Sequence, residues 1–120
     1  FRGGGDFVRA FGSAGRHEAN DAGEPCFQGP FDCAVSGGAV FVADEGNHRV
    51  QVATREGRFV RSLGAVGSGL GEFVRPRGVV SAPGGLVLVS DRENLRVQAL
   101  YPLPTGEGEP PTLGWRRVRG

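Results

Sequence analysis

The sequence Val42-Ala43-Asp44-Glu45-Gly46-Asn47-His48-Arg49-Val50-Gln51-Val52 returns 47 residues later as Val89-Ser90-Asp91-Arg92-Glu93-Asn94-Leu95-Arg96-Val97-Gln98-Ala99. Nine of the 15 positions from Gly37 to Gln51 are identical to those from Gly84 to Gln98. A shift of 52 residues also places Gly5–Gly15 on Gly57–Gly67, with six of 11 positions identical. A period of about 40 to 50 residues indicates a chain built from repeated structural units.

The spacing between the matched stretches changes along the chain. Pro30 pairs with Pro76 at a shift of 46, whereas the stretch further upstream matches at a shift of 52. This difference predicts about six extra residues in the first connection between units, within Arg16–Phe27. Because loops on a rigid scaffold commonly vary, we expect this connection to overhang one end of the unit and diversify its surface.

Within each unit the apolar runs are short and bounded by turn residues, which is typical of β-strands. In the first unit the predicted strands are Phe31–Val35, Ala39–Ala43, Arg49–Ala53 and Arg58–Leu63. In the second they are Gly78–Ser81, Leu86–Ser90, Arg96–Tyr101 and, beyond a Pro-rich loop, Trp115–Val118. The stretch Asp6–Phe11 matches a fourth strand and is interpreted as the outer strand of an earlier unit.

Composition supports an all-β fold. The 120 residues include 22 Gly and 8 Pro, which are unfavourable in helices. The runs Ala39–Ala43 and Leu86–Val89 are apolar on both faces, so we expect these strands to be covered on both sides. Four antiparallel strands per unit, graded from buried to exposed, describe a blade of a β-propeller.

The motif residues resemble a known family. The segment Gly71-Glu72-Phe73 with Pro76 and Gly78, followed by Val89, Asp91, Asn94 and Arg96-Val97-Gln98, is similar to the NHL repeat. The first unit carries Asn47-His48, from which the family takes its name, and the second has Leu95 in place of the His. The resemblance extends from Asp6 to Tyr101 and implies six-bladed propellers. We therefore predict a partial β-propeller with two four-stranded antiparallel blades and the outer strand of a preceding blade.

This interpretation divides the chain into four parts. Residues 1–15 would hold the outer strand of a preceding blade, 16–27 the inserted connection, 28–67 the first blade and 68–120 the second. The chain begins with Phe1 and contains no Met, so we expect it to be an internal piece of a longer protein. Uncovered blade faces would carry Val40, Val42, Val87 and Val89 or their neighbours, and would be covered by other blades or by self-association.

The repeated polar residues have a structural interpretation. They are Asp44, Asn47 and Arg49 in the first unit and Asp91, Asn94 and Arg96 in the second. Asp and Asn side chains commonly bond to nearby backbone in turns, and Arg reaches carboxylates or carbonyls. Because both units carry the same set, we expect it to hold the blade together and not to bind a ligand.

Residues that differ between the units are better candidates for recognition. The turn around Glu45 to His48 should neighbour the turn around Arg92 to Leu95, because adjacent blades bring corresponding loops together. The connection ending at Arg75 and Arg77 should join the same rim. The candidate binding residues are Glu45, His48, Arg75, Arg77, Arg92 and Leu95.

Other chemical sites are not favoured. The glycines from Gly64 to Gly71 resemble a phosphate loop, but Pro76 and a strand follow where a helix would be needed. The residues His17, His48, Cys26 and Cys33 lack the spacing of a metal site. We therefore expect no catalytic residue, no metal and no cofactor.

The formal net charge is +1, and no apolar run approaches the 18 or more residues of a membrane helix. We expect no membrane partner, and the absence of a secretory leader pattern favours a cytoplasmic location. The predicted function is a non-catalytic module for protein–protein interaction, such as the substrate-recognition part of a ubiquitin ligase. Two alternatives remain, an RNA-binding surface that uses Arg and Trp115, and a fragment of a metal-dependent propeller lyase.

Overall fold

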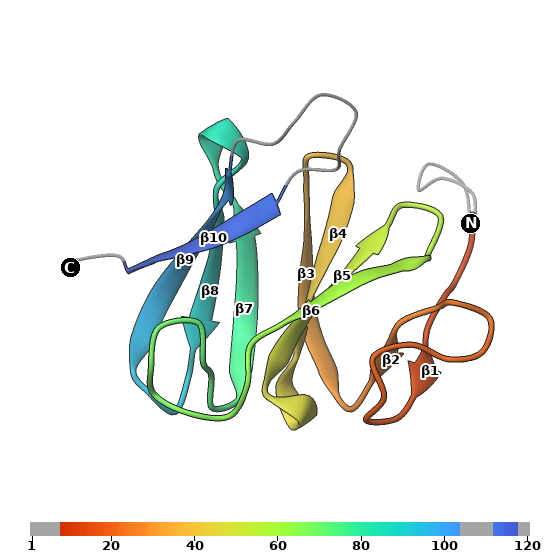
Figure 1. Ribbon diagram of the computed structural model, residues 1–120, viewed down its shortest axis with the longest axis horizontal. Helices are drawn as coiled ribbons and strands as arrows, with labels where there is room; N and C mark the ends of the chain where they lie inside the picture. The colour runs from red at the N-terminus through yellow and green to blue at the C-terminus, as the bar shows by residue number, and fades with distance from the viewer. Residues whose placement is uncertain (1–7, 104–111, 118–120) are drawn as a thin grey trace, which may run out of the picture.

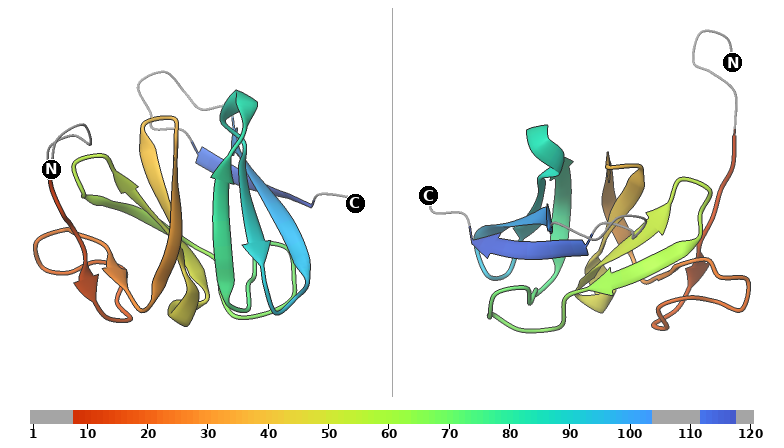
Figure 2. Two further views of the ribbon diagram at one scale, coloured as in Figure 1. Left: turned by 180° about the vertical axis from the view of Figure 1, so that it is seen from behind. Right: turned by 45° about the horizontal axis from the view of Figure 1, so that its top comes forward.

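The computed structural model describes residues 8–103 and 112–117, and its main strands form two four-stranded antiparallel sheets. The sheets follow each other along the chain and stand side by side, as Figures 1 and 2 show. No α-helix occurs among the described residues. The predicted all-β fold of two propeller-type blades is therefore confirmed.

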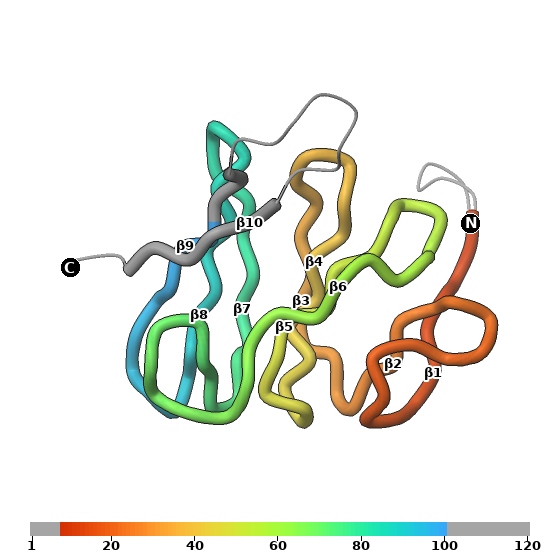
Figure 3. The backbone as a smooth tube through the Cα atoms, viewed as in Figure 1, coloured from red at the N-terminus to blue at the C-terminus, as the bar shows by residue number. Residues whose placement is uncertain are grey.

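Each blade is an up-and-down meander, which the tube in Figure 3 traces. Blade 1 consists of β3 (Pro30–Ser36), β4 (Ala39–Asp44), β5 (Arg49–Thr54) and β6 (Phe59–Leu63). Blade 2 consists of β7 (Pro76–Ser81), β8 (Val87–Asp91), β9 (Arg96–Leu103) and β10 (Thr112–Arg117). Short 3-10 turns, η1 (Glu45–Asn47) and η2 (Pro83–Gly85), join two of the strand pairs. All eight predicted strands of the two units are present, with ends displaced by a few residues.

The hydrophobic core lies between the two blades. Phe41 and Ala43 of β4 face blade 2, and Val87 and Val89 of β8 face blade 1. Leu100 of β9 is also fully buried in this cluster. Burial of such side chains contributes roughly 1.5–3 kcal/mol each, so this interface holds the blades together.

The uncovered face of blade 2 was expected to carry Val87 and Val89 or their neighbours. Val87 and Val89 themselves are 0% exposed because blade 1 covers them, whereas Val80 and Val97 of the same sheet are 59% and 43% exposed. The matching Val40 and Val42 line a hollow on the opposite, open face of blade 1. Successive side chains of a strand point to opposite faces of its sheet. Val87 and Val89 point to the face of blade 2 that blade 1 covers, and Val40 and Val42 point to the corresponding face of blade 1.

The first connection, Arg16–Phe27, packs against blade 1. Strand β1 (Ser13–Ala14) pairs in parallel with β2 (Cys26–Phe27), and the residues between them form a loop. Its tip accepts a hydrogen bond at the Gly23 carbonyl from the Phe59 N–H, 2.7 Å away, at the start of β6. Its first residues are held at the β4–β5 turn, because Arg49 donates to the carbonyls of Arg16 and His17. The insertion therefore runs from that turn to the start of the outer strand of blade 1, and its part in a binding surface stays a prediction.

The upstream stretch Asp6–Phe11 is described only from residue 8. Residues 8–12 form no strand, and an outer strand would need the third strand of its own blade as ladder partner. Its assignment to a preceding blade stays a prediction. Among the described residues, no helix is both long and apolar enough to cross a membrane.

Candidate functional site

A buried carboxylate organises the end of blade 1 where β4 turns into β5. Asp44 has an exposed fraction of 0% and accepts hydrogen bonds from Arg49 Nε at 2.8 Å and Asn47 Nδ2 at 2.9 Å. It also accepts the backbone N–H of Gln28 at 2.7 Å. The remaining Arg49 nitrogens donate to the carbonyls of Arg16, His17 and Cys26.

Blade 2 repeats this arrangement bond for bond. Asp91, also 0% exposed, accepts from Arg96 Nε, Asn94 Nδ2 and the Val74 N–H, each at 2.8 Å. The other Arg96 nitrogens donate to the carbonyls of Ser68, Gly69 and Glu72. In both blades the set therefore ties the turn to the segment that leads into the same blade. These contacts support the structural role predicted for the six repeated residues.

The glutamines at matching positions of the two units, Gln51 and Gln98, extend the same arrangement, a role that sequence reasoning missed. Gln98 accepts the Gly71 N–H at 2.9 Å through Oε1. The Oε1 atom of Gln51 is buried and has no partner among the described residues. Pro25 stands at the place of Gly71 in the first unit, and proline has no N–H to donate. The sequence signal that could have identified this role is the repeat of Gln at the matching positions 51 and 98.

The rim is built where the β4–β5 turn of blade 1 meets the segment leading into β7. Arg77 Nε lies 2.7 Å from Glu45 Oε2, and Arg75 Nη1 lies 3.5 Å from Glu45 Oε1. The Arg75 N–H donates to His48 Nδ1 at 3.0 Å. The structure thus brings four of the six candidate binding residues into contact, from two different blades.

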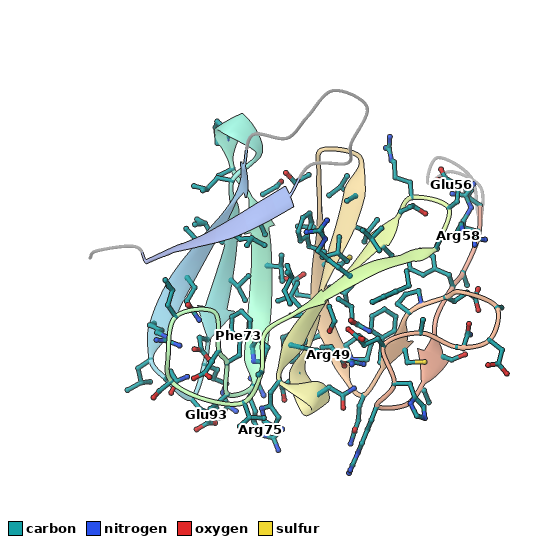
Figure 4. The ribbon with its side chains drawn as sticks, viewed as in Figure 1. Arg49, Glu56, Arg58, Phe73, Arg75 and Glu93 are labelled. Atoms are coloured by element: carbon teal, nitrogen blue, oxygen red, sulfur yellow. The ribbon has the colours of Figure 1, made fainter. Side chains whose placement is uncertain are left out.

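The other two candidates lie on the matching turn of blade 2. Arg92 pairs with the adjacent Glu93 at 3.3 Å, and the Glu93 N–H donates to Val74 in the segment that leads to Arg75. Leu95 has an exposed fraction of 92%. Within the described residues no hydrogen bond or ion pair joins Arg92 or Leu95 to the other four. Figure 4 shows Arg75 and Glu93 at the same end of the blades.

One neighbour of this rim was missed by sequence reasoning. The guanidinium carbon of Arg77 lies 4.6 Å from the centre of the Phe31 ring, a cation–π contact across the two blades. Phe31 was predicted only as a strand residue. Its distance of 46 residues from Arg77 in the sequence gave no signal of the contact.

Charge at the rim acts on Glu45. The hydrogen bond from Arg77 holds the pKa of the Glu45 carboxyl below its usual value of 4.5. Burial is the next largest effect and raises this pKa, whereas the positive charges of Arg77, Arg75 and Arg92 lower it. Arg92 therefore acts electrostatically on the same carboxylate without touching it.

The described residues offer no other chemical centre. No group of three His, Cys, Asp or Glu side chains that could hold a metal ion occurs among them. Cys26 is buried, Cys33 is exposed, and both are free thiols. The glycine-rich stretch forms the connection between blades, where Gly64 packs against the ring of Phe73.

The comparisons with known proteins agree with this geometry. The NHL repeat matches residues 27–53 and 73–100. The RING finger protein nhl-1 of Caenorhabditis elegans is 45% identical over 59 residues, which are 49% of this chain and 6% of that protein. The chain thus spans only a small part of that relative.

The fold and its repeated Asp–Asn–Arg sets define two successive blades of a β-propeller. One of the two segments that match the NHL repeat falls in each blade. NHL-repeat domains are generally non-catalytic modules that mediate interactions.

Removing either arginine of the repeated sets should destabilise the fold. Arg49→Ala or Arg96→Ala leaves a buried carboxylate without its main donor, which costs about 1–3 kcal/mol each in the free energy of unfolding. The exposed Arg55→Ala should change it by less than about 0.5 kcal/mol. Urea denaturation measures the free energy of unfolding of all three variants. Full stability of both Arg variants would show that the sets are not structural.

The Glu45–Arg77 pair should respond to pH. Because the folded pKa of Glu45 is lowered, the pair contributes stability above pH 4.5 and loses it as pH falls through the folded value. We expect the difference in unfolding free energy between the wild type and Glu45→Gln to be present at neutral pH and to vanish in acid. Urea denaturation over a pH series measures this, with Glu56→Gln on the β5–β6 turn as the control. A difference that does not change with pH would contradict the ion pair.

Proposed function

We propose that the rim surface, defined by Glu45, His48, Arg75, Arg77, Arg92 and Leu95, recognises a protein partner. The observation that carries this proposal is the contact between Glu45 and His48 of blade 1 and the two arginines that lead into blade 2. A surface that draws on both blades exists only in the folded module. Loops held on a rigid scaffold are the usual place for binding residues.

The chemistry of the rim suits a peptide or protein surface. Arg75 and Arg92 keep about half of their side chains exposed. Each guanidinium has five N–H donors, so donors remain for a partner's carbonyls or carboxylates. Leu95 adds an exposed apolar side chain beside them. Arg is enriched at protein interfaces, where it combines charge with a flat apolar surface.

The backbone of the rim is fixed before any partner binds. His48 and Arg75 both adopt positive φ, 54° and 57°, which is uncommon for residues other than glycine. Their mutual hydrogen bond and the adjacent Asp44 set stabilise this conformation. Preformed loops lose less conformational entropy on binding, which raises affinity.

The matched relative is a RING finger protein. We propose that in a longer protein this propeller selects the substrate of a linked RING-type ubiquitin ligase. The rim surface would then hold the protein to be modified, and the transfer chemistry would reside in the RING domain.

Charge reversal tests the rim directly. A random-peptide display library and a random RNA pool serve as probes for the wild-type chain, and the affinity of selected sequences is then measured. We expect selected peptides whose dissociation constants rise at least about tenfold in Arg75→Glu and Arg92→Glu. Arg58→Glu, on the turn that Figure 4 shows away from the rim, is the matched control.

The same experiment separates the RNA alternative. An RNA ligand would lose affinity with rising salt, by roughly one unit of log–log slope per phosphate contact, whereas a peptide should depend less on salt. Selected ligands that bind the rim variants as tightly as the wild type would show that the rim is not the site.

A further inference from the structure

The junction between the two blades at the rim holds one carboxylate between two arginines. Glu45 Oε2 accepts a hydrogen bond from Arg77 Nε at 2.7 Å, and Glu45 Oε1 lies 3.5 Å from Arg75 Nη1. The side chain of Glu45 is only 16% exposed, whereas those of Arg75 and Arg77 are 50% and 38% exposed. The two cations are therefore more open to solvent than the anion that neutralises them. Both blades that form this junction lie within the described residues.

Much of the hydrogen-bonding capacity of the two arginines is unused. Arg77 donates through Nε, and its guanidinium lies over the Phe31 ring at 4.6 Å. In the part of the chain that the structure describes, neither Nη atom of Arg77 makes a hydrogen bond, and the Arg75 side chain has only its long contact with Glu45. A guanidinium can hold both oxygens of a carboxylate at once. The junction therefore has donors left for a second carboxylate.

The backbone of Arg75 adopts a conformation that the first unit gives to a glycine. Its φ is 57°, in the left-handed region where residues other than glycine are uncommon. With Pro30 aligned on Pro76, the matching residue of the first unit is Gly29, whose φ is 77°. The second unit thus places an arginine where glycine would fit without strain. Backbone strain of this kind is typical of functional sites, so it points to a use for the Arg75 side chain.

The acid at position 45 is not part of the repeated Asp–Asn–Arg set. The matching position of the second unit holds Arg92, which has the opposite charge. The hydrogen bond from Arg77 is the largest of the effects that hold the pKa of Glu45 below its usual value of 4.5. A lowered carboxyl pKa means that the surroundings favour an ionised carboxylate over a neutral acid. The site thus has the chemistry of a receptor for a carboxylate, and the blade itself does not require the one it holds.

We infer that Glu45 occupies the place of a partner's carboxylate, and that the rim binds an acidic peptide whose Asp or Glu side chain is held by Arg75 and Arg77, a conclusion that rests on the function proposed for the rim. Glu45 competes with the peptide for the same donors and repels it by like charge. The affinity is therefore lower than the two arginines alone would give. Because Glu93 also lies beside Arg92, the rim suits a single carboxylate better than the continuous run of phosphates in RNA.

Removal of the competing carboxylate gives the sharpest test. Peptides are selected from a random display library on the wild-type chain, and each is compared with a version in which Asn and Gln replace Asp and Glu. We expect the selected peptides to be acidic and their neutral versions to bind at least about tenfold more weakly. Glu45→Gln should bind the acidic peptides about threefold more tightly, since an exposed ion pair has this strength. Glu56→Gln, which Figure 4 shows away from the rim, should bind them like the wild type.

Arg75→Gly separates binding from stability. Glycine keeps the backbone N–H that donates to His48 and adopts positive φ without strain. We expect the urea midpoint of this variant to equal or exceed that of the wild type, while the acidic peptides bind it at least about fivefold more weakly. A lower midpoint with unchanged affinity would give Arg75 a purely structural role and overturn the proposal.

The remaining outcomes distinguish the carboxylate from the rim itself. Peptides that lose affinity in Arg75→Glu but bind equally well without their carboxylates would overturn the acidic partner and leave the rim as the binding site. Acidic peptides whose affinity does not rise in Glu45→Gln would also overturn it, because Glu45 would then not compete. Peptides that bind Arg75→Glu as tightly as the wild type, or selection of RNA and not of peptides, would overturn the proposed function as well.

Discussion

The buried bond between an aspartate and an arginine, Asp44 with Arg49 and Asp91 with Arg96, is the interaction on which this structure depends. Hydrogen bonds to a fully buried carboxylate are charge-assisted and strong, and leaving that carboxylate unpaired is costly. Each aspartate therefore needs all of its donors in place at once. These donors come from the turn, from the next strand and from the connecting segment, so one buried group fixes the relative position of three chain segments.

The rim follows from that constraint. With the turn of blade 1 held by Asp44, His48 and Glu45 stand where the segment leading into blade 2 passes. That segment is itself held by Asp91 through the Val74 N–H. Arg75 and Arg77 follow Val74 directly in the chain, so the buried bond of Val74 to Asp91 places them beside Glu45. The rim residues that we propose for recognition can vary on such a support, because the buried bonds of the support do not involve their side chains.

Much of this architecture could be predicted from the sequence because the repeat places each strand twice. The identity of Asp44 with Asp91 indicated a structural set, and the even number of strands between turns placed Glu45 near Arg75. The sequence could not place Gly23, because the insertion that carries it has no second copy for comparison. The sequence also could not assign Val87 to a covered face, because it does not show on which side of blade 2 the preceding blade lies. The contact of Phe31 with Arg77 required the packed interface.

Hydrogen exchange in Asp91→Ala tests the central claim most directly. The account predicts that the Val74 amide, which donates to Asp91, exchanges at least about tenfold faster in the variant, since one lost bond of this strength corresponds to a factor of that size. The Glu93 amide, which donates to the Val74 carbonyl, should accelerate with it, while amides of β4 and β5 in blade 1 keep their protection. Asp21→Ala, at an exposed position in the insertion, should leave the exchange rates of the Val74 and Glu93 amides unchanged. Unchanged protection of Val74 in Asp91→Ala would contradict the account.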